Sequence, residues 1–132
     1  IGDFTLIPKG STFYCTRAEL TIGKKVIFGP KPTIITGDHR IDLIGKYIID
    51  VGDDEKLPNQ DAPVVIEDDV WIGAGTIILK GVRIGRGSVI GAGSIVTKDT
   101  QPYSINAGNP CRKIRMRFTD SEIEEHEKRL RP

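Results

Sequence analysis

Proton transfer near neutral pH falls most naturally to histidine, and this 132-residue chain has two, His39 and His126. His39 directly precedes a stretch rich in acidic and turn-forming residues. A lone histidine is more often structural than reactive, but its place at the entrance to such a stretch favours a general base. His126 lies among charged residues near the C-terminal end and is expected to be solvated. Two histidines are too few for a three-histidine zinc site, and no metal is expected.

The two cysteines, Cys15 and Cys111, stand far apart and form no C-x-x-C pair. Such usage is typical of free thiols in a reducing compartment, so we expect a cytoplasmic protein without a disulfide. No Ser-His-Asp or Cys-His arrangement is visible. Neither a signal peptide nor an apolar run of about 18 residues is present, so we expect a soluble chain without membrane insertion.

The net charge of +1 hides an asymmetry along the chain. Nine acids lie between Asp42 and Asp69 against two lysines, whereas five bases lie between Lys98 and Arg117 against one acid. Aromatic residues make up only 6% of the chain, so the basic segment is poor evidence for nucleic-acid binding. The basic segment suits a compact polyphosphate ligand better, although a solvated basic tail would have the same composition.

The elements that would position these residues follow a six-residue repeat from Ile66 to Gln101. Each unit starts with Ile or Val and has a small or β-branched fifth residue; the units start at positions 66, 72, 78, 84, 90 and 96. A period of six is the signature of a parallel β-helix, an all-β fold in which three units close a triangular coil of about 18 residues. We therefore expect like residues to stack one coil apart, Ile66 on Ile84 and Ile78 on Val96. An antiparallel barrel is the alternative, but barrel repeats are irregular in length.

Glycines in the second and fourth places of several units are expected to allow turn conformations that a Cβ would penalise. The repeat recurs more loosely at positions 22, 28 and 34, and position 66 does not continue that phase. The break in phase predicts a long loop, about residues 40–63, extruded from one corner of the prism.

After Gln101 two prolines and an Asn-Ala-Gly-Asn run predict a strand-breaking segment. Thr119 and Glu122 then fit a capping box, which predicts a short C-terminal α-helix over residues 120–130. The whole chain, residues 1–132, is expected to form one domain.

The stretch V-W-I-G-A-G-T-I-I-L-K-G-V-R-I-G-R-G-S-V-I-G-A-G-S-I-V-T-K-D at 70–99, followed by N-A-G-N-P-C-R-K-I at 106–114, resembles the left-handed β-helix acyltransferases. It is most similar to the galactoside/maltose and polysaccharide O-acetyltransferases and their xenobiotic relatives. The resemblance implies a left-handed parallel β-helix and a homotrimer with acetyl-CoA in the cleft between adjacent prisms. It also implies a catalytic histidine just before the extruded loop. His39 has that place and would act as the general base towards an acceptor hydroxyl.

The same resemblance implies which residues bind acetyl-CoA. Trp71 matches the tryptophan at the thiol end of the cofactor tunnel, although simple packing is the other role open to it. Ala74 and Ala92 match places where main-chain groups bind the pantetheine arm. Thr97 and Lys98 match a Thr-Lys pair near the adenosine end of the cofactor. Three basic residues match those that face the phosphates: Arg112, Lys113 and Arg115.

The acceptor is not implied by the resemblance. Residues 1–20 do not resemble the sugar-binding domain of the galactoside and maltose enzymes, and the loop is longer and more acidic than theirs. Asp38 and Asp42 are candidates for contacting an acceptor or orienting His39, although Asp38 is expected to point away from its neighbour. A backbone carbonyl or a carboxylate from another coil would serve equally to orient the imidazole.

The leading hypothesis is acetyl-CoA-dependent O-acetylation of a sugar or glycan hydroxyl. One alternative is N-acetylation of an amino or nucleotide sugar, and another is O-acetylation of a small xenobiotic alcohol. A non-catalytic β-helix scaffold is the third, but a scaffold needs neither a histidine beside the loop nor the A-G-N-P-C-R segment.

Overall fold

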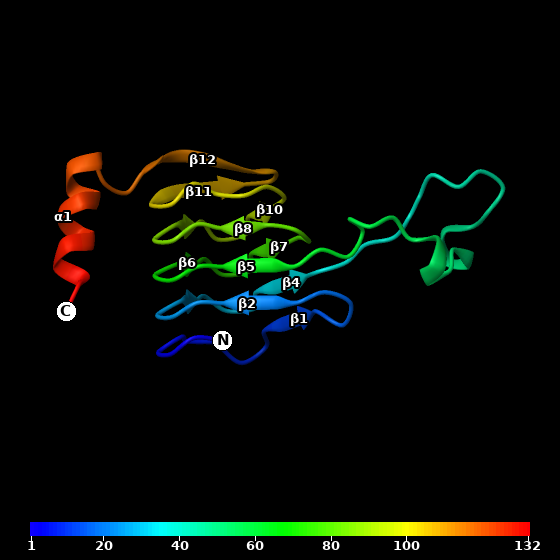
Figure 1. Cartoon of the computed structure of the whole chain (residues 1–132), viewed down its shortest axis with the longest axis horizontal. Helices are drawn as coiled ribbons and strands as arrows, with labels where there is room; N and C mark the ends of the chain where they lie inside the picture. The colour runs from blue at the N-terminus through cyan, green and yellow to red at the C-terminus, as the bar shows by residue number, and fades with distance from the viewer.

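The computed structural model describes residues 1–132, and the strands stack into a parallel β-helix with three faces (Figure 1). The first face holds β2 (Leu20–Ile22), β5 (Val64–Ile66) and β8 (Arg83–Ile84). The second face holds β3 (Ile27–Phe28), β6 (Trp71–Ile72), β9 (Val89–Ile90), β11 (Ser104–Gly108) and β12 (Cys111–Met116). The third face holds β1 (Thr12–Tyr14), β4 (Thr33–Ile35), β7 (Ile77–Ile78) and β10 (Ile95–Val96). The predicted β-helix is confirmed.

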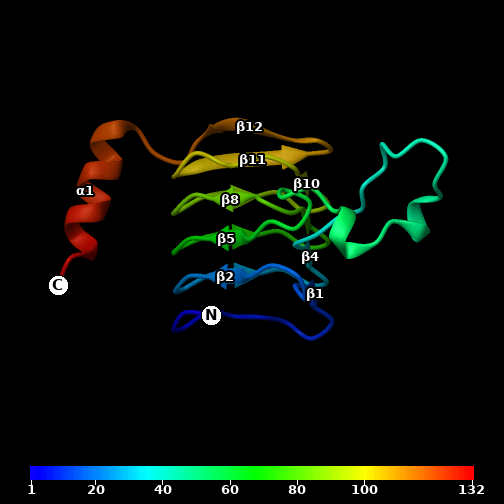
Figure 2. The ribbon, with the colours of Figure 1, turned by 45° about the vertical axis from the view of Figure 1, so that its right-hand side comes forward.

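Three edges join the faces. The helix edge lies between the first and second faces, where helix α1 (Asp120–Leu130) packs. The alanine edge lies between the second and third faces and carries the turns at Ala74 and Ala92. The loop edge lies between the third and first faces, where the chain leaves the prism between β4 and β5. Helix α1 and the loop project from opposite sides of the prism in both views (Figures 1 and 2).

Aliphatic side chains fill the interior in stacked columns. Ile66 pairs with Ile84 and Ile78 pairs with Val96, one coil apart, and all four are at most 1% exposed. The predicted stacking and the 18-residue coil are therefore confirmed. Ile34, however, pairs with Ile78, 44 residues further on. Because each later coil takes 18 residues, 26 residues leave the stack as the extruded loop.

The corners explain the small residues of the repeat. Thr76, in a fifth place, is fully buried, and its hydroxyl donates to the carbonyl oxygen of Gly73 at 2.7 Å. Gly75, in a fourth place, has φ +66°, a left-handed conformation that favours glycine, as expected. Gly73, in a second place, is needed for another reason. A Cβ on Gly73 would lie 2.4 Å from the amide nitrogen of Ala92 in the next coil, so close stacking rather than the turn excludes a side chain.

The prediction of a strand-breaking segment after Gln101 is wrong. Strand β11 continues the stack parallel to β9, and β12 returns antiparallel to β11. The prolines fall just outside both strands. Asn106 takes the interior place that an aliphatic residue has in other coils, and its side-chain amide donates to the hydroxyl oxygen of Ser104 at 2.9 Å. This hydrogen bond makes a buried amide acceptable where the repeat would place isoleucine.

The first 14 residues add a partial coil that the repeat does not reveal. Strand β1 pairs with β4 through Thr12–Tyr14 and Thr33–Ile35, and Leu6 forms a parallel bridge with Ile27. These residues extend the second and third faces by one row.

Helix α1 begins with the predicted capping box, in which the side chains of Thr119 and Glu122 each accept a hydrogen bond from the other's amide. The helix is held at the helix edge by Glu127, which accepts a hydrogen bond from the Tyr103 hydroxyl and pairs with Arg86 at 2.7 Å. With 11 residues, α1 is too short to span a membrane, and no other helix of the chain is longer.

His126 is not simply solvated, which corrects the expectation. Its ring lies 5.8 Å from the ring centroid of Tyr103 and 5.1 Å from that of Phe118. Its Nε2 is buried without a hydrogen-bond partner, 3.9 Å from a carboxylate oxygen of Asp69. Both His126 and Glu127 lie against prism residues, Asp69 and Arg86 respectively, and a charged sequence context alone does not reveal this.

Candidate functional site

The loop leaves the prism through a two-stranded neck, residues 36–38 and 60–62. The Ala62 amide donates to the carbonyl oxygen of Thr36 at 2.9 Å, and the Asp38 amide donates to that of Gln60 at 2.9 Å. Gly37 and Asp61 form an antiparallel bridge between the two strands. The neck fixes both ends of the loop against the prism, and the loop itself contains two short 3-10 helices, η1 (Ile48–Asp50) and η2 (Asp53–Glu55).

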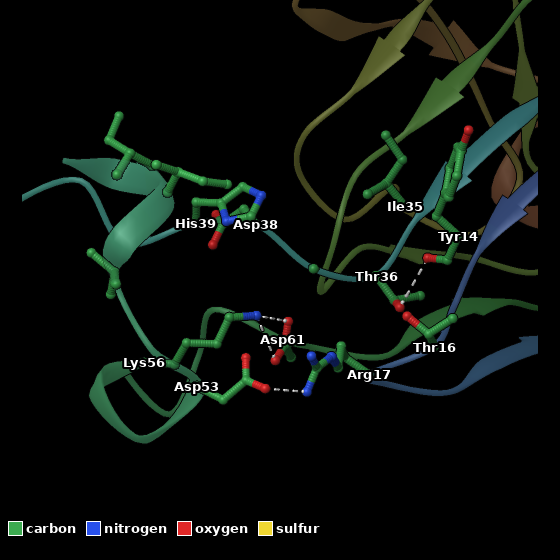
Figure 3. A pocket seen from close by; sticks show the side chains of 14 residues that line it. Tyr14, Thr16, Arg17, Ile35, Thr36, Asp38, His39, Asp53, Lys56 and Asp61 are labelled. Carbon is green, nitrogen blue, oxygen red and sulfur yellow. Dashed lines mark hydrogen bonds and ion pairs between the residues drawn. The ribbon is translucent and has the colours of Figure 1, made fainter.

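His39 follows the outgoing strand of the neck and lines a cavity of about 520 Å³ between the loop and the end of β1 (Figure 3). Its side chain is exposed, and no other group of the chain forms a hydrogen bond with its ring. An imidazole free of internal partners at the wall of a cavity has both nitrogens available for an incoming ligand.

The charged residues around this cavity are arranged in pairs. Arg17 and Asp53 are 2.7 Å apart, and Lys56 donates to both carboxylate oxygens of Asp61 at 2.8 and 3.0 Å (Figure 3). The Arg17–Asp53 pair joins the segment after β1 to η2 of the loop. Both of its members are more than half exposed, and such a pair contributes little stability.

Asp38 and Asp42, the acidic candidates next to His39, have separate partners. Asp38 lines the cavity, but one carboxylate oxygen lies 2.9 Å from Nζ of Lys80 and the other accepts a hydrogen bond from Gln60 at 3.5 Å. Asp42 does not line the cavity and accepts a hydrogen bond from Arg40 at 2.8 Å. This hydrogen bond holds the pKa of Asp42 below its ordinary value. Neither carboxylate contacts the imidazole.

Apolar side chains complete the cavity and continue onto the outside of the loop. Ile48 and Ile49 of η1 line the cavity opposite Tyr14, which is 61% exposed. Further along, the loop presents an apolar surface, the loop-tip patch, made of Ile41, Ile44, Tyr47 and Ile49. All four are at least 78% exposed, and they lie within nine consecutive residues of the loop.

Trp71 lies on the second face and is 56% exposed. Strand pairing aligns it with Ile27 on one side and Val89 on the other, and the same row continues through Ile105 to Arg115. Residues directly opposite each other in a sheet share a face, so Trp71 and Arg115 both point outward from the second face. Together with Leu6, the exposed Ile27 and Trp71 form an apolar second-face stripe.

Ala74 and Ala92 lie one above the other on the alanine edge. The Gly93 amide donates to the carbonyl oxygen of Ala74 at 2.8 Å, and both alanines are exposed. Only methyl groups stand on these two turns, so a ligand lying along the edge can come close to their main chain, although the Ala74 carbonyl is already hydrogen-bonded.

A basic hollow of about 270 Å³ lies at the C-terminal end of the stack. Lys98, Arg112 and Lys113 line it together with Asp99, whose carboxylate accepts a hydrogen bond from the Arg83 amide at 2.8 Å and forms no ion pair with the three cations. Lys113 is hydrogen-bonded to the amide oxygen of Gln101 at 2.8 Å, and Arg112 remains exposed. Cys111 also lines the hollow; burial raises the pKa of its thiol, so it is not an activated nucleophile.

The structure brings the candidate residues together in two groups. Lys98, Arg112 and Lys113 share the basic hollow, while Trp71 and Arg115 share the second face beside the alanine turns. Thr97 is exposed on the loop edge, directly before Lys98. His39 also stands at the loop edge, the edge that does not adjoin the second face. A single chain therefore leaves His39 apart from Trp71.

Sequence reasoning missed Tyr14, Lys56 and Lys80 around the cavity and neck. Tyr14 and Lys56 lie outside the regular hexads, so no repeat position identifies them. For Lys80 a signal exists: it stands 18 residues before Lys98, so both occupy the same place on the loop edge. No group of three or more His, Cys, Asp or Glu side chains is placed to hold a metal ion.

Comparisons with known proteins agree with this geometry. The family described as Bacterial transferase hexapeptide (six repeats) matches residues 63–98. A galactoside O-acetyltransferase of Lactococcus lactis is 39% identical over 109 residues, which cover 83% of this chain and 48% of the relative. The crystal structure of a maltose O-acetyltransferase from Clostridium difficile superposes with a TM-score of 0.69 at 35% identity, covering 89% of this chain and 58% of that one.

A galactoside acetyltransferase in complex with coenzyme A superposes with a TM-score of 0.63 at 29% identity, covering 92% of this chain and 66% of that one. The chain thus spans about half the length of the curated relative, and under two thirds of each of the two solved enzymes.

Proposed function

Because the chain belongs to the hexapeptide-repeat acyltransferases with a left-handed parallel β-helix, we propose that it is an acetyl-CoA-dependent O-acetyltransferase acting on a hydroxyl of a sugar or glycan. The observation that carries the proposal is the free imidazole of His39 at the wall of the cavity beneath the loop.

In this reaction His39 acts as the general base. Its imidazole accepts the proton of the acceptor hydroxyl while the oxygen attacks the thioester carbonyl; the C–S bond then breaks, the sulfur of coenzyme A takes the electron pair, and the imidazolium returns the proton to it. The acetyl group passes from sulfur to oxygen, so no covalent enzyme intermediate is needed. A base of this kind contributes about 100- to 10,000-fold to the rate.

The chain's residues fit acetyl-CoA in three respects. The basic hollow has three cations without carboxylate partners, which suits the phosphates of a nucleotide. The alanine edge offers exposed main chain for the pantetheine arm, and the half-exposed Trp71 offers an apolar wall for its thiol end. We assign cofactor binding to these residues, with Thr97 beside the hollow at the adenosine end.

We further propose a homotrimer whose active sites lie between adjacent prisms. Support comes from two exposed apolar surfaces on different sides of one chain, the loop-tip patch and the second-face stripe. When two different patches of one protein bind each other, the contacts repeat head to tail, and they close into a ring where the rotation between subunits permits it. Such a ring would bring His39 of one chain to the second face of the next, which the isolated chain cannot do.

The test is His39→Ala, with His126→Ala as the matched control. We expect kcat to fall by at least about 100-fold in His39→Ala with KM for acetyl-CoA nearly unchanged, because the base acts only on the acceptor proton. The measurement is release of the coenzyme A thiol with maltose and methyl β-galactoside as acceptors. Unaltered turnover in His39→Ala would remove the general base from the proposal.

A further inference from the structure

Lys80 reaches from the prism to both strands of the loop neck. It follows β7 at the loop edge, and its side chain is only 25% exposed. Its Nζ lies 2.9 Å from a carboxylate oxygen of Asp38 and donates to the carbonyl oxygen of Asn59 at 2.7 Å. Asp38 belongs to the outgoing strand and Asn59 directly precedes the incoming strand, so one ammonium group joins both to the stack.

Gln60 completes this arrangement from inside the loop. It is 7% exposed; its amide nitrogen donates to the second carboxylate oxygen of Asp38, and its amide oxygen accepts from the Leu57 amide at 2.9 Å. Both oxygens of Asp38 are thus occupied, by Lys80 and by Gln60. Asp38 is therefore committed to the neck rather than to the imidazole beside it.

The neck also rests on the turn that carries Lys80. The Gly81 amide donates to the carbonyl oxygen of Ala62 at 3.2 Å. The incoming strand is held by this main-chain contact as well. The outgoing strand ends at Asp38, directly before His39. At this end its contact with the next coil is the ion pair between Asp38 and the Lys80 side chain.

We propose that Lys80 is a positioning residue, which fixes the main chain at Asp38 and thereby the place of His39 relative to the prism. This inference rests on the proposed function of His39 as the general base. A ligand held against the second face of a neighbouring prism must find the imidazole at hydrogen-bond distance, and a displacement of about 1 Å can cost about 100-fold in rate.

The experiment compares Lys80→Met, Lys80→Arg and Lys9→Met in the full chain. Methionine keeps the apolar stem and removes the charge, arginine keeps the charge, and Lys9 is exposed and has no ion-pair partner. With maltose or methyl β-galactoside as acceptor, Lys80→Met should lower kcat by at least about 10-fold and leave KM for acetyl-CoA within about twofold. Lys80→Arg should restore most of kcat, and Lys9→Met should match the wild type.

A second measurement needs no acceptor. Trypsin should cut after Arg40 or Lys46 several times faster in Lys80→Met than in the wild type, because loss of the clamp opens the neck. Asp38→Asn removes the other member of the ion pair and should raise the cleavage rate equally. The test therefore remains valid even if Lys80→Met alone has a folding defect. In the double variant the two losses should not add.

The outcomes separate this inference from the proposed function. If His39→Ala is inactive while Lys80→Met keeps both the wild-type kcat and the wild-type cleavage rate, the positioning role is wrong and the general base stands. If Lys80→Met raises KM for acetyl-CoA as much as it lowers kcat, or if arginine restores nothing, Lys80 has only a general structural role. If His39→Ala retains full kcat, the general base itself fails.

Discussion

At the scale of single residues, the site depends on which charges are already paired. Asp38 binds Lys80 and Asp42 binds Arg40, so the two acids nearest to His39 do not contact its ring. By contrast, the cations Lys98 and Arg112 at the end of the stack have no carboxylate partner. The unpaired cations are therefore free to form charge-assisted hydrogen bonds with an anionic ligand.

The double variant Arg112→Ala/Arg115→Ala tests the proposed phosphate contacts, with Arg112 in the basic hollow and Arg115 on the second face. We expect it to raise KM for acetyl-CoA with little change in kcat, because phosphate contacts remote from the reacting carbonyl give uniform binding. Competition by coenzyme A and by dephospho-coenzyme A measures the phosphate contribution directly. The wild type should bind coenzyme A more tightly, and this preference should shrink in the variant. An unchanged preference would contradict the phosphate role of these arginines.

At the scale of elements, the hexads made the stack predictable. A residue type recurring every six places has one consistent environment, so the buried columns through Ile66 and Ile78 follow from the spacing alone. The same reasoning missed β11, because Asn106 stands where the repeat has an aliphatic residue. The hydrogen bond from its side chain to Ser104, which allows its burial, is visible only in the structure. The neck was equally hidden, since its hydrogen bonds join residues more than 20 positions apart.

Candidate site residues were predictable to the extent that they sit on the repeat. Trp71, Ala74 and Lys98 have places in a hexad, and the structure puts each at a definite edge or face. Residues that close the cavity from the loop, such as Lys56 and Ile48, have no periodic place. Their contacts depend on the path of the loop, and no local pattern encodes that path.

Helix α1 should loosen from the prism in acid. The hydrogen bond from Tyr103, followed by the charge of Arg86, holds the pKa of Glu127 below its ordinary value of 4.5. A depressed pKa in the folded state means that the ionised carboxylate stabilises the docked helix above about pH 4.5, and that this stabilisation is lost as the pH falls below it. Hydrogen exchange of residues 120–130 should therefore accelerate below that pH, relative to the intrinsic rate.

Glu127→Gln is the variant that isolates this contact, and Glu125→Gln is its control. Glu127→Gln should show fast exchange in α1 at all pH values, because glutamine cannot supply the charge. Glu125 pairs only with Arg129 on the exposed side of the helix, so Glu125→Gln should behave as the wild type. A pH-independent exchange rate in the wild type would show that Glu127 does not hold the helix.

At the scale of the whole molecule, the two groups of residues that we propose to form one site lie on different sides of a single chain. The loop-tip patch and His39 belong to the loop edge, whereas Trp71 and the second-face stripe lie on the face across the prism. Sedimentation should show a trimer at working concentrations. A stable monomer would rule out a cofactor cleft between subunits.

Mixed trimers give a sharper test. His39→Ala and Arg112→Ala/Arg115→Ala are each expected to be poorly active at low acetyl-CoA, but each keeps the half of the site that the other lacks. Unfolding and reassembling an equal mixture should restore activity at about one quarter of the sites, if every site takes His39 from one chain and the arginines from the next. Recovery no greater than that of either variant reassembled alone would place both halves in one subunit.

The neck has a consequence for how such proteins can differ from one another. Its hydrogen bonds between residues 36–38 and 60–62 return the chain to the coil at the place where it left, so Ile34 still stacks on Ile78 after an excursion of 26 residues. The register of the stacked coils therefore does not depend on the residues beyond the neck. For protein engineering, the neck is therefore a site of insertion: the segment between its two strands can be replaced by one of different length and chemistry while the prism keeps its structure.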